Sequence, residues 1–245
     1  MAQETGRVAI ITGGNKGIGL ETGLQLARRG VTVLLGARDL AKGEKAAQGL
    51  KKEGLDVRAI QLDVTDQASI AAAVGRVERE FGRLDILVNN AAVMVDGRPA
   101  SPSTVPVSAW RETFETNVFG LVAVTQAFLP LLRKSAAGRI VNLSSILGSL
   151  AEHSDPASPI YHALVPAYDA SKAAVNMFTV ELAHELKDTK IKVNAAHPGW
   201  VKTDMGGAEA PMELTDGAKT SVWLATLPDD GPTGGFFHMM VHMRW

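Results

Sequence analysis

Short apolar runs alternate with longer segments of helical period along the 245-residue chain, and this alternation is the strongest constraint on its fold. A run rich in Val, Ile and Leu followed by a helix is typical of a βαβ unit, whose strands are parallel. Because crossovers between parallel strands are right-handed, successive units wind into one sheet with helices on both faces. The sequence therefore predicts an α/β fold with a single, doubly wound parallel sheet.

The expected elements follow one another closely, with two interruptions. Strands are expected at residues 8–12, 31–36, 57–63, 84–89, 139–143, 192–196 and 235–237. Helices are expected at residues 17–29, 40–53, 67–81, 108–133 and 166–187. The Pro-, Ser- and Asp-rich stretches 95–106 and 149–166 predict long loops. Since ligands bind beyond the carboxyl ends of such strands, we expect these loops to wall a substrate site.

The composition excludes several classes of partner and chemistry. With 25 basic and 26 acidic residues the net charge is −1, which gives no field for nucleic acid or an anionic membrane. The absence of cysteine excludes disulfides, thiolate nucleophiles and Cys-ligated zinc. His238 and His242 have no third ligand nearby, so no metal is expected. We expect one soluble, cytoplasmic domain, residues 1–245, that acts on a small molecule.

A glycine-rich turn follows the first expected strand and leads into the first expected helix. Its sequence, at residues 12–19, is TGGNKGIG. Glycines permit a tight turn and a close backbone approach to a pyrophosphate, whose charge then lies at the helix N-terminus. The alternative is a plain strand-to-helix turn, which the position within a βαβ unit disfavours. The cofactor-binding residues expected here are Gly13, Asn15, Lys16, Gly17, Ile18 and Gly19.

The residues after the second expected strand bear on the choice between NAD and NADP. An acidic residue about 20 positions after the glycines holds the ribose of NAD, whereas an arginine there accommodates the 2′-phosphate of NADP. Arg38 occupies this place, and Lys16 can approach the same phosphate. Two cations converging on one dianion favour NADP(H). The alternative is that Asp39 binds the ribose hydroxyls while Arg38 is merely solvated.

A tyrosine and a lysine four positions apart form the candidate acid/base pair. The chain has two tyrosines, and only Tyr168 has a lysine, Lys172, at the spacing that places both side chains on one helix face. A free phenol has a pKa near about 10, so acid/base catalysis at neutral pH requires its anion to be stabilised. The Lys172 ammonium would do this. The alternative is a chance pair on a solvated helix.

Several motifs, in order along the chain, resemble those of the short-chain dehydrogenase/reductase family. The turn resembles its TGxxxGxG, residues 89–92 match its NNAG with one change, and residues 197–203 look like its PG motif. The residues that match its catalytic tetrad are Asn117, Ser145, Tyr168 and Lys172. The resemblance covers nearly the whole chain and implies a sheet of Rossmann type. It is strongest to the NADPH-dependent carbonyl reductases, which carry a longer insertion before the tyrosine.

The resemblance also implies roles for single residues. Ser145 would polarise the substrate carbonyl, with Ser144 as the rival, and a helix kink at Asn117 would let a backbone carbonyl hold a relay water near Lys172. Asp63 would meet the adenine with Val64 beside it, whereas a helix cap, its structural alternative, suits Asp66 better. Further cofactor contacts implied are Asn90, Ala91, Tyr168, Lys172, Pro198, Gly199, Val201 and Thr203. Pro198 and Gly199 could instead form a simple turn.

The expected activity is reduction of a ketone or aldehyde, with hydride from NADPH and a proton from Tyr168. One alternative is NAD(P)⁺-dependent oxidation of a steroid, sugar or polyol alcohol, which the same residues would serve. A non-catalytic NADP(H) sensor is a further alternative, which the set of Ser145, Tyr168 and Lys172 disfavours. Pairing of the two long helices, 108–133 and 166–187, between subunits would give a homo-oligomer.

Overall fold

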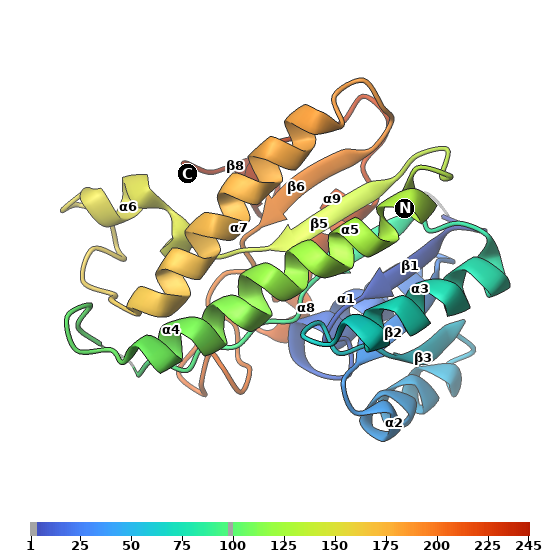
Figure 1. The fold of residues 1–245 in the computed structure, drawn as a ribbon, viewed down its shortest axis with the longest axis horizontal. Coiled ribbons are helices and arrows are strands. Elements are labelled where there is room, and N and C mark those ends of the chain that lie inside the picture. Colours follow the sequence, from blue (N-terminus) through green and yellow to red (C-terminus); the bar gives the residue numbers. More distant parts are fainter. Residues whose placement is uncertain (1–3, 98–99) are drawn as a thin grey trace.

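One parallel sheet organises the computed structural model, which describes residues 4–97 and 100–245 (Figure 1). Its eight strands lie in the order β3-β2-β1-β4-β5-β6-β7-β8. β1 to β7 are parallel and β8 is antiparallel to β7. The strands are β1 (Val8–Ile11), β2 (Thr32–Ala37), β3 (Val57–Gln61), β4 (Ile86–Asn89), β5 (Arg139–Leu143), β6 (Lys192–Ala196), β7 (Phe236–His238) and β8 (Val241–His242). The predicted doubly wound α/β sheet of Rossmann type is confirmed.

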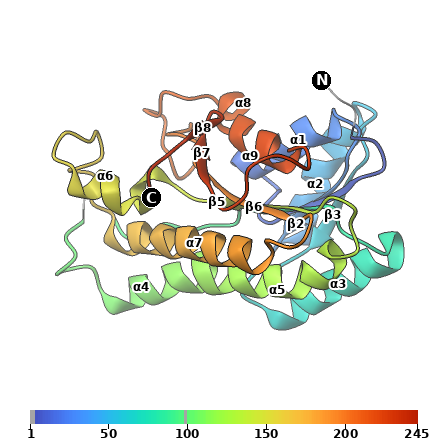
Figure 2. The ribbon, with the colours of Figure 1, turned by 90° about the horizontal axis from the view of Figure 1, so that it is seen from above.

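Helices cover both faces of this sheet (Figure 2). α3, α5 and α7 pack on one face, and α1, α2 and α9 contribute to the core of the other. The helices are α1 (Gly17–Ala27), α2 (Leu40–Lys51), α3 (Gln67–Phe81), α4 (Val107–Phe114), the π-helix η1 (Glu115–Gly120), α5 (Leu121–Leu132), the 3₁₀ turn η2 (Ile146–Gly148), α6 (Leu150–Ser154), α7 (Pro166–Glu185), α8 (Leu214–Gly217) and α9 (Lys219–Ala225).

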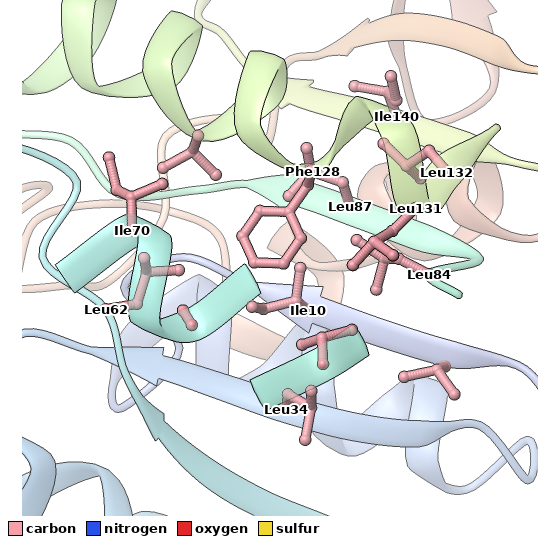
Figure 3. Packing of buried hydrophobic residues seen from close by; sticks show 14 of the residues in the cluster. Ile10, Leu34, Leu62, Ile70, Leu84, Leu87, Phe128, Leu131, Leu132 and Ile140 are labelled. Atoms are coloured by element: carbon pink, nitrogen blue, oxygen red, sulfur yellow. The ribbon is translucent and has the colours of Figure 1, made fainter. Parts of the chain in front are cut away.

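Successive residues of each central strand enter different cores. In β1, Ile10 belongs to the core under α3 and α5, whereas Ile11 belongs to the core under α1 and α2. This follows from the two-residue period of a strand and explains why the strands are apolar throughout. The ring of Phe128 on α5 lies close to Ile10 and Leu87 of the sheet (Figure 3). Burial on both faces therefore fixes the register that brings the strand ends together.

The strand register places the predicted motifs along one edge of the sheet. Ile11 pairs with Val88, Asn89 pairs with Asn142, and Leu143 pairs with Ala196. The chain that follows each of these strands thus leaves the sheet at the same edge. The glycine turn, the segment after β4, the serine segment after β5 and the loop after β6 consequently lie side by side.

The helix predicted at residues 108–133 is divided into three parts. α4 and α5 flank η1, whose wider π turns contain Asn117. A π segment relaxes the regular ladder and is common at functional sites, in agreement with the kink that the family resemblance implied. Val107–Leu132 is long and apolar enough by composition to cross a membrane. Here its apolar residues, such as Val124 and Leu131, lie in the core beside α3 and α7.

Other elements were missing from the sequence prediction. Within the loop predicted at 149–166 lies α6, which Ser149 caps by accepting a bond from Glu152 N. α8 and α9 are too short to show a clear helical period, and β8 has two residues. The last predicted strand is shifted to Phe236–His238. Arg98 and Pro99, in the other predicted loop, lie outside the described residues.

Candidate active site

A cleft of about 930 Å³ opens at the carboxyl edge of the sheet. Among the predicted site residues, its wall contains Gly13, Asn15, Lys16, Gly17, Ile18, Gly19, Arg38, Asp63, Val64, Asn90, Ala91, Ser145, Tyr168, Lys172, Pro198, Gly199, Val201 and Thr203. Asn117 is the predicted site residue that does not line this wall. The structure thus brings together residues that are up to 190 positions apart in sequence.

The glycine turn forms a close-fitting cradle against the segment after β4. Gly13 has a φ of +61°, and a Cβ there would lie 3.1 Å from Ala91 Cα. A Cβ on Gly19 would lie 2.5 Å from Asn90 Nδ2, which donates to Thr12 O at 2.8 Å and to Gly13 O at 3.1 Å. Only glycine is compatible with this packing. Asn90 therefore braces the turn from behind.

The N-terminus of α1 faces the cleft beside this cradle. Lys16 occupies the N-cap position, and its side chain makes no cap hydrogen bond. The first-turn N–H groups of a helix have no partner within the helix and carry a partial positive charge. An anion such as a pyrophosphate would be stabilised at this position.

Two cations, Lys16 and Arg38, line the cleft beside the glycine turn and the end of β2. Arg38, directly after β2, is exposed and forms no hydrogen bond or ion pair with another described residue. Lys16 Nζ lies 2.6 Å from Asp204 Oδ2 in an exposed ion pair. Asp39 is not part of the wall; its carboxylate caps α2 by accepting from Lys42 N at 3.2 Å. That hydrogen bond lowers the pKa of Asp39.

Asp63 and Val64 lie where the chain leaves β3. The Asp63 carboxylate accepts from Thr65 N at 3.0 Å and from Thr65 Oγ1 at 2.8 Å. The cap of α3 is Asp66, which accepts from Ala68 N, as the sequence predicted. A Cβ on Gly120 would lie 2.8 Å from Val64 Cγ2, so η1 approaches this part of the wall closely.

Tyr168 and Lys172 lie one turn apart on α7 and both are buried. Lys172 Nζ lies 5.5 Å from the centroid of the Tyr168 ring and donates to Leu143 O at 2.7 Å. Burial lowers the pKa of Lys172 to about 8. The amino group is still mostly protonated at neutral pH, and its one described acceptor is a neutral carbonyl. A cation in this position stabilises a negative charge that develops nearby.

The two neighbouring serines make different bonds. Ser144 Oγ donates to Asn176 Oδ1 at 2.6 Å. Ser145 Oγ accepts from Leu147 N at 3.2 Å, which starts η2, and it donates to no described residue. The proton of Ser145 is thus available to a ligand in the cleft, whereas that of Ser144 is engaged. The geometry favours Ser145 over its rival.

Asn117 acts behind the wall. Its side chain accepts from Val93 N and donates to Val93 O, both at 2.8 Å, and it donates to Ser171 Oγ at 3.0 Å. These bonds join η1 to the segment after β4 and to α7. Both Nδ2 hydrogens are therefore donated within the protein, and the relay water that the family resemblance implies would bind the backbone carbonyl.

The loop after β6 forms the opposite side of the cleft. Thr203 Oγ1 accepts from Gly206 N at 2.9 Å, and Trp200 Nε1 donates to Gly206 O at 2.8 Å. Trp200 lines the cleft and is 52% exposed to solvent. A Cβ on Gly17 would have Thr203 Cγ2 as its nearest atom, at 3.8 Å. The two sides of the cleft therefore approach each other at the glycine turn.

The sequence analysis missed two positioning residues. The buried Asp96 carboxylate accepts from Ala167 N at 2.8 Å and from Tyr168 N at 3.5 Å, and so caps α7 from a distant segment. His197 Nδ1 accepts from Ile146 N at 3.3 Å and Gly199 N at 3.4 Å. Burial, with a smaller effect of His238, lowers the pKa of His197 to about 3. Neither role has a local signal, because the partners are distant in sequence or belong to the backbone.

The end of the cleft beyond Ser145 and Tyr168 is apolar. The side chains on this part of the wall are Val93, Leu147, Pro159, Ile160, Ala163, Val165, Trp200 and Met205. Two charged residues of the loop after β6 line the cleft, and both are paired: Lys202 with Glu213 and Asp204 with Lys16. Such a surface binds an uncharged, apolar molecule best.

Comparisons with known proteins agree with this geometry. A short chain dehydrogenase family model matches residues 7–214. The chain is 36% identical to carbonyl reductase [NADPH] 1 of Homo sapiens, over 94% of this chain and 95% of the relative. It is 34% identical to a (+)-neomenthol dehydrogenase of Capsicum annuum, over 97% and 98%. Both alignments, 269 and 309 residues long, exceed the length of this chain, so these relatives contain insertions.

Solved structures share the fold closely. Salutaridine reductase from Papaver somniferum has a TM-score of 0.83 at 32% identity, covering 95% of this chain and 99% of that one. A short chain dehydrogenase from Shigella flexneri 2a str. 301 complexed with NADP has a TM-score of 0.83 at 29% identity, covering 96% and 97%. The resemblance drawn from the motifs is confirmed: this chain belongs to the short-chain dehydrogenase family.

Proposed function

We propose that this protein reduces a ketone or aldehyde to an alcohol with NADPH. The observation that carries the proposal is the placement on one cleft wall of Tyr168, the buried Lys172 amino group and the Ser145 hydroxyl, whose proton has no described acceptor. A phenol beside a buried cation, with a second hydroxyl donor nearby, suits proton transfer to a carbonyl oxygen. The oxidoreductase family of the chain supplies the reaction type.

The described residues fit a dinucleotide. A Cβ on Gly13 or Gly19 would overlap Ala91 or Asn90. Because these positions are glycines, a pyrophosphate could lie close to the backbone of this turn, beside the N-terminus of α1. Arg38 has no competing partner among the described residues, and Lys16 could exchange the exposed Asp204 for a phosphate. Asp39 is used as a helix cap and lies off the wall. These features support NADPH over NADH.

Each catalytic side chain has a distinct task in the proposed mechanism. Bound along this wall, a reduced nicotinamide would supply the hydride. Ser145 donates its hydroxyl hydrogen to the substrate oxygen and polarises the carbonyl. Tyr168 gives its phenolic proton to that oxygen, and the Lys172 ammonium stabilises the phenolate that remains. Asn117 holds α7 and Val93 in register, and its backbone carbonyl is the proposed site of the relay water.

We infer that the substrate is uncharged and largely apolar. Its walls would be Leu147, Ile160, Ala163 and Trp200, beyond the polar groups that bind the carbonyl oxygen. Burying a charged substrate group there would require a counter-charge, and the described part of this wall offers none that is unpaired. An alicyclic or aryl ketone meets both conditions. Oxidation of the corresponding alcohol would use the same residues, and the relatives named as a reductase and as a dehydrogenase are 36% and 34% identical to this chain.

Three wider expectations from the sequence remain part of the proposal. One sheet contributes both ends of the cleft, which supports a single domain, residues 1–245, that binds both cofactor and substrate. The cytoplasmic location is proposed from the sequence alone. Val107 on α4, Phe119 on η1 and Met177 on α7 are each more than half exposed. This apolar surface supports homo-oligomer formation through these helices, which sedimentation would measure.

The test is a matched pair of tyrosine variants. Tyr168→Phe removes the proposed proton donor, and we expect ketone reduction to fall by about 10²–10⁴-fold. NADPH affinity should change little because the ring is retained. Tyr161→Phe is the control: Tyr161 is the other tyrosine of the chain, lies in the loop before α7 and is absent from the cleft wall. NADPH oxidation with a panel of apolar ketones gives the rates. A Tyr168→Phe enzyme as active as the control would refute the mechanism.

A further inference from the structure

We propose that Arg244 and Trp245 position the substrate wall and thereby determine which ketones the enzyme accepts. This inference rests on the proposed function, since the wall belongs to the substrate end of the same cleft. Neither residue lines the cleft itself. They act through the segment 149–165, and four residues of this segment line the cleft: Pro159, Ile160, Ala163 and Val165.

The C-terminal segment is fixed to the sheet before it reaches this wall. Met243 N donates to Phe236 O at 2.8 Å, and the Trp245 ring stacks on the Phe236 ring at 5.4 Å with an interplanar angle of 14°. Phe236 is fully buried in β7. The hairpin that turns the chain back has Met239 at φ +47° and Met240 at φ +68°, a conformation that side chains rarely adopt. Such a turn persists only where the surrounding contacts hold it.

From this anchor the segment reaches α6. Figures 1 and 2 both show the C-terminal end beside α6. Ala151 N donates to Trp245 O at 3.0 Å. The Arg244 guanidinium lies 2.8 Å from Glu152 Oε1 and 3.4 Å from Asp155 Oδ2. One guanidinium thus joins two carboxylates of the loop, and this arrangement raises the pKa of Arg244.

Glu152 connects Arg244 to the part of the loop that lines the cleft. Its side chain is largely buried, and its second oxygen, Oε2, accepts from Ser158 Oγ at 2.9 Å. Ser158 directly precedes Pro159 and Ile160 of the wall. Several other bonds near this part of the loop, such as Ser158 N to Asp155 O and Ala163 N to Ile160 O, are local and would move with it. The line of contacts from Arg244 through Glu152 to Ser158 therefore links the sheet to the substrate wall.

Loss of these contacts should weaken substrate binding without slowing the chemical step. Loosening this line of contacts should let the wall move away from a bound ketone, which weakens binding of bulky substrates that touch Ile160. Ser145, Tyr168 and Lys172 are held by other contacts, with Leu147 N, the Asp96 carboxylate and Leu143 O respectively, so the chemical step should be preserved. NADPH lies at the other end of the proposed site and should bind as before.

The experiment compares Arg244→Ala with Arg28→Ala. Arg28 is the matched control because it is similarly exposed and pairs with Glu53 at 2.9 Å, away from the cleft. For Arg244→Ala we expect KM for bulky apolar ketones to rise about 5- to 10-fold, with kcat within about twofold and the Kd for NADPH unchanged. Arg244→Lys, which keeps the charge, should restore part of the loss. Arg28→Ala should leave all three constants unchanged.

Hydrogen exchange on the same proteins separates this inference from the proposed function. In Arg244→Ala, backbone amides of residues 150–161 should exchange faster, whether or not a ketone substrate has been found. Unchanged exchange, or faster exchange with unchanged KM for every ketone, would overturn the inference. Absence of NADPH-dependent reduction by the wild-type protein would instead overturn the proposed function. Equal losses in kcat and NADPH binding would indicate general destabilisation and also overturn the inference.

Discussion

Replacement of Gly148 by alanine gives a stringent test of how the serine segment packs on the catalytic helix. Gly148 ends η2, and a Cβ there would lie 2.6 Å from Lys172 C and 2.7 Å from Lys172 Cβ. Ordinary contacts begin at 3.4 Å, so η2 and α7 would have to separate. The nearest atom belongs to helix backbone, which cannot rotate out of the way. The added methyl group must therefore displace either Ser145 or Lys172.

The size of the effect follows from this geometry. Overpacking of this kind destabilises by about 1–3 kcal/mol. For a chain of this length about 2 kcal/mol corresponds to a Tm lower by about 4–8 °C. A displacement of nearly 1 Å between catalytic groups is expected to lower kcat/KM by about 10²-fold. Activity should thus fall far more than the loss of folded protein at assay temperature explains.

Gly49→Ala is the matched control for this variant. Gly49 lies within α2 on an exposed face, and a Cβ there would have no neighbour within 4 Å. The same substitution should therefore stabilise the fold by about 0.5–1 kcal/mol and leave activity unchanged. Thermal unfolding and NADPH-dependent ketone reduction measure both quantities. Gly148→Ala with wild-type Tm and rate would show that the close packing of η2 on α7 is wrong.

Three further predictions concern charge. Arg38→Asp should weaken NADPH binding by about 10- to 100-fold and NADH binding far less; equal losses would place the 2′-phosphate elsewhere. Burial lowers the pKa of Lys172 from 10.5 to about 8 in the folded protein. The cost of burying the cation is therefore complete below pH 8, and the free energy of unfolding rises as the pH increases from 8 to 10.5. Lys172→Met should therefore raise stability at pH 7 by about 1–3 kcal/mol while ending activity, and a lower Tm would contradict this. His197 has a folded pKa of about 3 against an ordinary 6.5, so the stability that its neutral form provides is complete above pH 6.5 and is lost as the pH falls towards 3. Urea unfolding should show a loss of about 2 kcal/mol between pH 7 and pH 5, most of which His197→Asn removes; an unchanged pH dependence in that variant would refute the assignment.

The strands of the sheet and the proposed cofactor-binding residues could be predicted from sequence because their signals are local. A strand buried on both faces is a short apolar run, as in β1, and needs no knowledge of its neighbours. Gly13 and Gly19 are required by a turn within eight residues. Tyr168 and Lys172 are related by a helical period. Each of these features is a property of one segment of the chain.

The residues that hold the site in position carry no such local signal. Asp96 caps a helix that begins 70 residues later, because Val165 at the N-cap position has no side-chain acceptor. An aspartate in a polar loop gives no signal in the sequence, and its capping role exists only in the folded chain, where the segment after β4 reaches the start of α7. Similarly, the π turn around Asn117 depends on bonds to Val93 and Ser171 that lie on two other elements.

The proposed substrate end differs from the proposed cofactor end in the same way: its residues come from segments that are distant in sequence. Every dinucleotide presents the same phosphates, so short motifs suffice to bind it, and the reaction type follows from those motifs. The proposed substrate wall is assembled from segments that meet only in the folded chain. These are the segment 149–165 and the loop after β6 that contains Trp200, with Arg244 and Trp245 behind them. Insertions in such loops change the wall without disturbing the sheet, and the carbonyl reductase relatives contain insertions. We therefore expect substrate preference to depend on how each chain anchors its own loops, and the anchor proposed here is the Arg244 guanidinium between Glu152 and Asp155.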